Sequence, residues 1–302
     1  MNQSGINTLI RLNSLGFLPA QQKVATIAES CDSFSVLNEN GNTVYAGIVS
    51  GPILSSDTGE TLYKADFTEV KTPGSYKLHV PGLGYSVDFQ IGDNIYNQAF
   101  RTAMIGMYLW RCGTAVSAEH NGITFKHEAC HCDDAWLDYT GVGHIKKLST
   151  GGWHDAGDYN KYVVNAGVTL GLMFKAWEQF KERVSSCSHL SENAGPFPDY
   201  LLEIKWEIDW LLTMQFESGA VSHKISAKRF CPFILPEKEL EPRFFTDWGS
   251  TATADFIAML SMASRVFTPY DEAYAEICLT AAWKSYTFLI DNPQQHDPDQ
   301  TD

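Results

Sequence analysis

The chain has 302 residues, of which 44% are hydrophobic and 19% charged, and its net charge is −14. This composition is typical of a globular protein large enough for two domains. The acidic balance argues against nucleic acid as a partner, because phosphate binding requires a basic surface. No apolar run in the sequence reaches the length of a membrane span, so a membrane is not expected as a partner either.

The first residues carry no recognisable export signal. In Met1–Leu12 no sustained apolar core follows a basic region, as it would in a signal peptide. The chain has seven cysteines, an odd number, and in a reducing compartment these remain thiols or metal ligands. The missing export signal predicts a cytoplasmic protein.

Residues from about 7 to 92 have the pattern of short strands separated by turns. The expected strands are Thr8–Leu12, Lys23–Ala28, Ser33–Leu37, Thr43–Ala46, Thr61–Phe67, Ser75–Val80 and Tyr85–Ile91. Apolar and polar residues alternate in the last of them, which indicates a strand with one buried face. About seven strands in so short a segment predict a small sandwich. We therefore assign residues 1–92 to a β-sandwich domain.

Beyond the last of these strands the apolar residues recur at helical spacing. The expected helices are Ile95–Arg111, Tyr162–Arg183, Asp199–Gln215, Thr251–Phe267 and Tyr270–Ile290. Ser250 or Thr251 is predicted to cap the fourth helix. Trp206 and Trp210 could be sugar platforms, but rings at helical spacing more often pack in a core. Residues 93–302 are therefore assigned to a second, mainly helical domain.

Acidic and aromatic side chains are concentrated in one stretch between the first two predicted helices. Residues Gly151–Tyr162 read GGWHDAGDYNKY, with Asp155 and Asp158 three residues apart beside the rings of Trp153 and Tyr159. The glycine pair permits a tight loop, and a water molecule between two acids can be activated as a nucleophile. A bare pair of acids could equally be a solvated turn. Rings beside carboxylates, however, are what a carbohydrate site requires.

This twelve-residue string resembles the signature of family 9 glycoside hydrolases, the cellulase-type enzymes that invert the anomeric carbon. The resemblance assigns Asp158 as the general base and Asp155 as an acid that helps to hold the water. It continues through later segments such as Ala252–Phe256 and covers nearly all of residues 8–302. It implies an immunoglobulin-like β-sandwich followed by an (α/α)6 barrel of twelve helices in two rings of six.

Five predicted long helices are too few for that barrel, so the chain is expected to hold only its first half. The C-terminal remainder of the barrel is then expected as a further part of the protein. An inverting glycosidase needs an acid and a base about 6.5–9.5 Å apart. The resemblance places the general acid at a glutamate near the C-terminal end of the barrel, which is not expected within this chain. If the chain is complete as given, a non-catalytic carbohydrate-binding protein is the alternative.

A second group of functional side chains precedes the acid pair. Four cysteine or histidine residues fall within Cys130–His144, and thiolates together with imidazoles are typical zinc ligands. The alternative is a buried thiol with unconnected loop histidines. The resemblance implies one structural zinc (Zn²⁺) that pins the loop beside Asp155. Its ligands would be Cys112, Cys130, His131 and His154, with His144 in reserve for the fourth.

Many members of the family also bind calcium near a segment like the one that begins at Pro198. Where many of them have an Asp-Glu pair, this chain has Leu202 and Glu203. Because the loss of a hard oxygen ligand weakens such a site, we expect no calcium there.

The expected substrate is a short β-1,4-linked oligosaccharide, because insoluble cellulose is out of reach without an export signal. Overall similarity favours the exo-β-D-glucosaminidase branch of the family, which acts on chitosan oligosaccharides, over a β-1,4-glucanase acting on sugars of the cellobiose type. Asp138 and Asp134 would then lie near the ammonium group, a charge-assisted contact. Trp153 and Tyr159 would contact the sugar. The alternative for the two acids is a helix cap or a solvated position.

Overall fold

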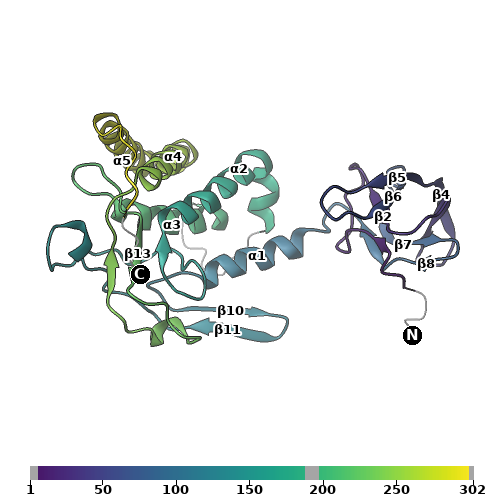
Figure 1. Cartoon of the computed structure of the whole chain (residues 1–302), viewed down its shortest axis with the longest axis horizontal. Helices are drawn as coiled ribbons and strands as arrows, with labels where there is room; N and C mark the ends of the chain where they lie inside the picture. The colour runs from purple at the N-terminus through teal and green to yellow at the C-terminus, as the bar shows by residue number, and fades with distance from the viewer. Residues whose placement is uncertain (1–5, 188–196, 299–302) are drawn as a thin grey trace. The chain divides into compact units, whose positions relative to one another are not determined.

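The computed structural model describes residues 6–187 and 197–298. The chain divides into two compact units between Ala99 and Phe100 (Figure 1). Each unit has a hydrophobic core of its own. Within the described residues, no helix combines the length and the hydrophobicity needed to cross a membrane.

The N-terminal unit is a sandwich of two antiparallel sheets (Figure 1). The first sheet has the order β1-β2-β6-β5, formed by Ile10–Arg11, Val24–Ile27, Thr61–Asp66 and Ser50–Leu54. The second has the order β4-β3-β7-β8 with β9 also on β7, formed by Thr43–Ile48, Ser33–Asn38, Gly74–Val80, Gly84–Tyr85 and Phe89–Ile91. Buried residues alternate along β2 and β7, so the inner faces enclose the core. This is the immunoglobulin-like domain that the sequence predicts.

The sandwich differs from the predicted strands in two places. Tyr85–Ile91 is divided into β8 and β9, because the hydroxyl of Ser86 accepts a hydrogen bond from the backbone N–H of Leu78 at 2.9 Å. This bond replaces one that a backbone carbonyl would accept in a regular ladder. Strand β5 was not predicted, because it contains Pro52, which has no N–H to donate. Such a residue is tolerated here because β5 is an edge strand.

All five predicted helices are present in the second unit (Figure 1). They are α1 at Asn97–Leu109, α2 at Val163–Cys187, α3 at Asp199–Met214, α4 at Ser250–Phe267 and α5 at Glu272–Asp291. Helix α3 is the most enclosed, and Ile204, Ile208 and Leu211 on it are fully buried. Trp210 is 1% exposed, which confirms its expected role in the core. This helical unit fits the expected part of an (α/α)6 barrel.

The predicted cap of α4 is wrong. Its N-cap is Gly249, and Ser250 is already the first helical residue. The hydroxyl of Ser250 instead accepts a hydrogen bond from the backbone N–H of His296 at 2.8 Å. In α5 a side chain does cap the helix, since Asp271 accepts a hydrogen bond from the N–H of Tyr274 at 2.9 Å.

Short strands that were not predicted lie between the helices. A hairpin joins β10 at Val116–His120 to β11 at Ile123–His127, and a small sheet has the order β12-β13-β14. The strands of this sheet are Lys161–Tyr162, Lys224–Ala227 and Arg243–Phe245. They are too short for a periodic signal. The sheet nevertheless positions the candidate site, because β12 directly follows the acidic loop.

Candidate functional site

The acidic loop, Gly151–Asn160, is fastened to the residues that follow α1. The backbone N–H of Cys112 donates to the carbonyl of Gly152 at 2.7 Å. In return, the N–H of His154 donates to the carbonyl of Trp110 at 2.8 Å. These bonds hold the start of the loop in one place before the two aspartates are reached.

Gly152 fits its position because it has no side chain. Its φ of +76° lies in the left-handed region, and a Cβ atom there would come within 2.6 Å of Trp210 Cγ. Trp206 approaches from the same helix and donates its Nε1–H to the carbonyl of Gly152 at 3.0 Å. The loop can therefore pass this close to α3 only at a glycine.

We expect Gly152→Ala to destabilise the protein by about 3 kcal/mol, to which the left-handed backbone contributes roughly 1–2 kcal/mol and overpacking the rest. Urea unfolding would measure the loss. Gly157→Ala in the same loop is the matched control, because no atom lies within 4 Å of a Cβ atom added there. Equal stability of the two variants would show that the contact with Trp210 does not constrain the loop.

Asp158 has one carboxylate oxygen held by hydrogen bonds and one without a hydrogen-bond partner among the described residues. Its Oδ2 atom accepts hydrogen bonds from the hydroxyl of Tyr162 at 2.9 Å and from Asn160 Nδ2 at 3.1 Å. Asn160 is itself fixed, because its Oδ1 atom accepts from the N–H of Ala227 in β13 at 3.1 Å. Oδ1 of Asp158 is buried and accepts no hydrogen bond from the described residues. A carboxylate held in this way can accept a proton from a bound water.

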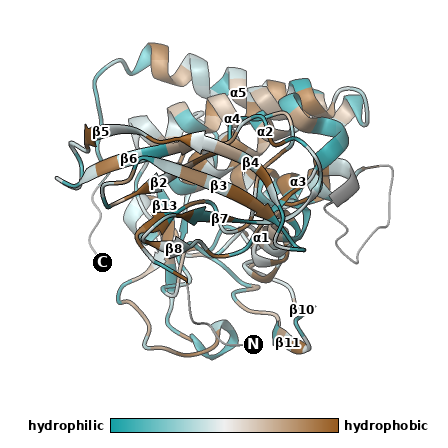
Figure 2. Cartoon of the chain, turned by 90° about the vertical axis from the view of Figure 1, so that its right-hand side faces the viewer, coloured by the Kyte–Doolittle hydropathy of each residue, from teal (hydrophilic) through white to brown (hydrophobic). Residues whose placement is uncertain are grey.

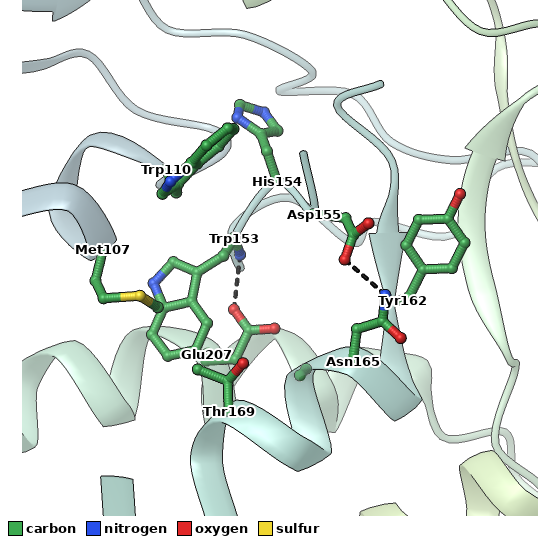
Figure 3. A pocket seen from close by; sticks show the side chains of 10 residues that line it. Met107, Trp110, Trp153, His154, Asp155, Tyr162, Asn165, Thr169 and Glu207 are labelled. Carbon is green, nitrogen blue, oxygen red and sulfur yellow. Dashed lines mark hydrogen bonds between the residues drawn. The ribbon is translucent and has the colours of Figure 1, made fainter. Parts of the chain in front are cut away.

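Asp155 lies on the same loop in a different environment. It is exposed, and its Oδ1 atom accepts a hydrogen bond from Asn165 Nδ2 at 2.6 Å (Figure 3). The two predicted acids therefore share one loop, with Asp158 partly buried and Asp155 open to solvent.

A pocket of about 150 Å³ lies beside Asp155 (Figure 3). Its lining residues are Met107, Trp110, Trp153, His154, Asp155, Tyr162, Asn165, Ala166, Thr169 and Glu207. The backbone N–H of Trp153 donates to Glu207 at 2.6 Å, and its indole N–H donates to Glu203 at 2.7 Å. Trp153 is only 7% exposed, so most of its ring serves packing and a small part of it remains for a ligand.

Two glutamates of α3 in this region were not predicted. Glu203 forms an ion pair with Arg111 at 2.8 Å, which occupies the carboxylate considered above for calcium. Burial raises the pKa of Glu207 well above its ordinary value. Two glutamates four residues apart on the apolar face of a helix are the sequence signal that could have indicated them.

The four predicted metal ligands lie together. The donor atoms of Cys112, Cys130, His131 and His154 are all within 4.8 Å of one another. Cys112 Sγ lies 3.7 Å from His131 Nδ1, and Cys130 Sγ lies 3.5 Å from His154 Nε2. Bond lengths near 2.3 Å for sulfur and 2.1 Å for nitrogen place tetrahedral zinc ligands roughly this far apart. His144 is not part of the cluster; it is largely exposed and pairs with Asp138 at 3.0 Å.

The pKa values of two of the four predicted ligands, Cys112 and His154, are shifted toward the protonation states that bind metals. Burial opposes ionisation of Cys112, but hydrogen bonds from Cys130, His131 and His154 and the charge of Lys161 lower its pKa well below the ordinary value. Burial lowers the pKa of His154. A thiolate beside a neutral imidazole is the form in which both bind zinc. The other two predicted ligands are shifted the opposite way. The hydrogen bond with Cys112 and burial raise the pKa of Cys130. Although burial lowers the pKa of His131, its contacts with Cys112 and Glu239 raise it overall.

Three predicted sugar contacts have other partners in the structure. The prediction for Asp134 is wrong: its side chain is 4% exposed and lies between Lys161 Nζ at 3.2 Å and Arg243 Nη2 at 3.3 Å. It is a buried counter-ion that cannot meet a substrate ammonium. Asp138 pairs with His144 and does not line the pocket beside Asp155. Tyr159 donates its hydroxyl to the carbonyl of Ile234 and does not line that pocket either.

Comparison with known proteins gives consistent matches over both units. The family described as glycosyl hydrolase family 9 matches residues 96–302, and the cellulase N-terminal ig-like domain matches residues 7–85. Endoglucanase D of Acetivibrio thermocellus is 55% identical over 287 residues, which cover 94% of this chain and 46% of that protein. Cellodextrinase of Butyrivibrio fibrisolvens is 32% identical over 289 residues, which cover 95% of this chain and 52% of that protein.

A solved structure agrees with these matches. AaCel9A in complex with cellobiose-like isofagomine has a TM-score of 0.82 and 29% identity, covering 97% of this chain and 54% of its own. The chain spans about half the length of each of these three relatives.

Proposed function

Since this chain belongs to glycosyl hydrolase family 9 and carries the cellulase N-terminal ig-like domain, we propose that it forms part of an inverting glycosidase that cleaves β-1,4-linked glucans. The mechanistic part of the proposal rests on the hydrogen bonding of the Asp158 carboxylate. Tyr162 and Asn160 fix one of its oxygens, and the other is buried and accepts no hydrogen bond from the described residues. That oxygen takes a proton from water while the water oxygen attacks the anomeric carbon.

A second carboxyl group must give a proton to the departing sugar oxygen. We assign this acid to the remainder of the family's catalytic domain, as the sequence resemblance implies. In the present chain Asp155 then assists Asp158 in holding the water.

Two observations favour a glucan over an amino sugar. The relatives described above are named as an endoglucanase and a cellodextrinase, and the solved relative is bound to a cellobiose-like compound. In addition, Asp134 is neutralised by Lys161 and Arg243. The β-1,4-glucanase alternative of the sequence analysis therefore replaces exo-β-D-glucosaminidase as the proposed activity.

Apolar faces on two helices support the proposal that further helices complete the barrel. Helix α5 exposes Trp283, Tyr286 and Ile290 by 60%, 47% and 59%, and its hydropathy can be followed in Figure 2. Helix α2 exposes Val168 and Leu172 by 64% and 70%. A hollow of about 190 Å³ lies between α4 and α5. Because the relatives are about twice as long, we assign these faces to further helices of the family 9 domain.

We also propose that Cys112, Cys130, His131 and His154 hold one structural zinc. The clustering of their donor atoms supports this. Four protein ligands leave no position for a substrate, so the zinc fixes the loop and does not take part in hydrolysis. His154 directly precedes Asp155, which places the metal next to the acid pair.

The substrate prediction can be tested on a complete enzyme, in which this chain is followed by the remainder of the Endoglucanase D catalytic domain. We expect kcat/KM for cellotetraose to exceed that for chitosan tetrasaccharide by at least about tenfold, because a pocket shaped for one substituent commonly discriminates by that much. Release of reducing sugar measures both rates.

Asp138→Ala is the control for this experiment. It removes the remaining acid that was predicted to bind an ammonium, and we expect it to leave the preference unchanged. A higher kcat/KM for the chitosan tetrasaccharide, reversed in Asp138→Ala, would restore the amino-sugar interpretation.

A further inference from the structure

His131 is contacted on both sides of its ring. Its Nδ1 atom lies 3.7 Å from Cys112 Sγ, whereas its Nε2 atom lies 3.0 Å from Glu239 Oε2. The side chains of His131 and Glu239 are 4% and 1% exposed, so little water competes for this contact. One ring nitrogen therefore faces the cysteine–histidine cluster, and the other faces a carboxylate.

The contact with Glu239 determines which nitrogen of His131 can bind a metal. A neutral imidazole carries its proton on one nitrogen and offers a lone pair on the other. A carboxylate beside Nε2 favours the proton on that atom, which leaves Nδ1 as the ligand. The contact at 3.0 Å is an ion-pair approach, because neither Nε2 nor the two oxygens of Glu239 makes an aligned hydrogen bond among the described residues.

His154, the other imidazole of the cluster, has a different surrounding. Its Nε2 atom lies 3.5 Å from Cys130 Sγ. Its ring packs against those of His127 and Tyr159, with centroids 5.9 and 5.0 Å away. Among the described residues no ion pair joins it to a carboxylate, so Glu239 acts on His131 alone.

Glu239 also connects the cysteine–histidine cluster to the acidic loop, through Arg243. Arg243 Nη1 lies 3.8 Å from Glu239 Oε2 and donates to the backbone carbonyl of Tyr159 at 2.8 Å. Arg243 Nη2 lies 3.3 Å from Asp134, which in turn lies 3.2 Å from Lys161 Nζ. The four side chains form a buried row in which positive and negative charges alternate. Burial of each charge is thus compensated by its neighbour.

We propose that Glu239 is a positioning residue of the metal centre, which orients His131 toward the metal and, through Arg243, joins the centre to the backbone of the residue that follows Asp158. This inference rests on the zinc site proposed above. Because His131 and Glu239 are far apart in the sequence, the sequence alone does not indicate this role for Glu239.

The experiment compares zinc binding by the wild-type chain with binding by Glu239→Ala, Glu239→Gln and the control Glu241→Gln. Glu241 is exposed on the same segment. Competition with a chromophoric chelator gives the zinc dissociation constant. We expect Glu239→Ala to weaken zinc binding about 10–100-fold, the usual cost of losing such an outer partner. Glu239→Gln should lose less, because its amide oxygen still accepts the Nε2–H, and Glu241→Gln should bind as the wild type does.

Two further readouts separate positioning from general destabilisation. With cobalt in place of zinc, the visible absorption of Glu239→Ala should differ from that of the wild type, since the ligand is reoriented. The difference in Tm between zinc-loaded and metal-free protein should also shrink in Glu239→Ala. Unchanged zinc affinity with both Tm values lowered equally would overturn the inference while leaving the zinc site intact. Absence of zinc binding by the wild type would overturn both.

Discussion

Replacement of Asp158 by asparagine is expected to remove nearly all turnover from the complete enzyme. The loss of one acid–base group commonly costs about 10²–10⁴-fold in rate. Asparagine has the same shape and can still accept the hydrogen bonds from Tyr162 and Asn160. It cannot, however, accept a proton from water. Turnover of cellotetraose should therefore disappear while the thermal stability and sugar binding are retained.

Two variants serve as controls for Asp158→Asn. Asp155→Asn should cause a smaller loss of kcat, because Asp155 is proposed only to assist in holding the water. Asp138→Asn should leave turnover unchanged, because Asp138 pairs with His144 and is assigned no part in holding the water. If Asp158→Asn turned over as fast as the wild type, or if Asp155→Asn were the more damaged of the two, the assignment of the base would be wrong.

Removal of the proposed zinc should have the second large effect. Extensively dialysed protein is expected to contain about one equivalent of zinc by elemental analysis. A ligand present a thousandfold above its Kd stabilises the folded state by about 4 kcal/mol. In a unit of about 200 residues this corresponds to a fall in Tm of roughly 10 °C when the metal is lost. Cys130→Ser should reproduce both the loss of zinc and the fall in Tm.

Cys132→Ser provides the matched control for Cys130→Ser. Cys132 is exposed two residues further along, and its Sγ atom contacts the carbonyls of Gly113 and Cys130. We expect this variant to keep both its zinc and its Tm. Protein that contained no metal and was as stable as the zinc-treated form would instead identify Cys112 and Cys130 as plain buried thiols.

The features that could be predicted from the sequence are those with a local signal. The five helices were found because apolar residues recur along each of them, as Ile204, Ile208 and Leu211 do along α3. Asp155 and Asp158 were identified because a twelve-residue string surrounds them. These predictions required no knowledge of which distant segments meet.

The features that could not be predicted depend on contacts between distant segments. Asp134 was expected near a substrate ammonium because its segment lies between the predicted metal ligands and the acid pair. Its burial follows from Lys161 and Arg243, which β12 and β14 bring to it from later in the chain. Glu239 has no signal of its own, since its role follows from its distance to His131.

Hydrogen bonds between small polar side chains and the backbone account for the remaining differences between the predicted and observed elements. Ser86 divides one predicted strand by offering its hydroxyl in place of a carbonyl. Ser250 bonds to the N–H of His296 and so does not cap α4. In both cases a small polar side chain has several possible partners, and only the folded chain selects among them.

The alternating row of Lys161, Asp134, Arg243 and Glu239 has a consequence for heating. The hydration of charged groups becomes less favourable as temperature rises, so the cost of keeping such charges away from water declines. Hydrophobic contacts gain no comparable advantage. Because Arg243 holds the carbonyl of Tyr159, the segment next to Asp158 is anchored by the contacts that weaken least on warming. The acidic loop should therefore keep its shape up to temperatures at which the surrounding helices begin to loosen.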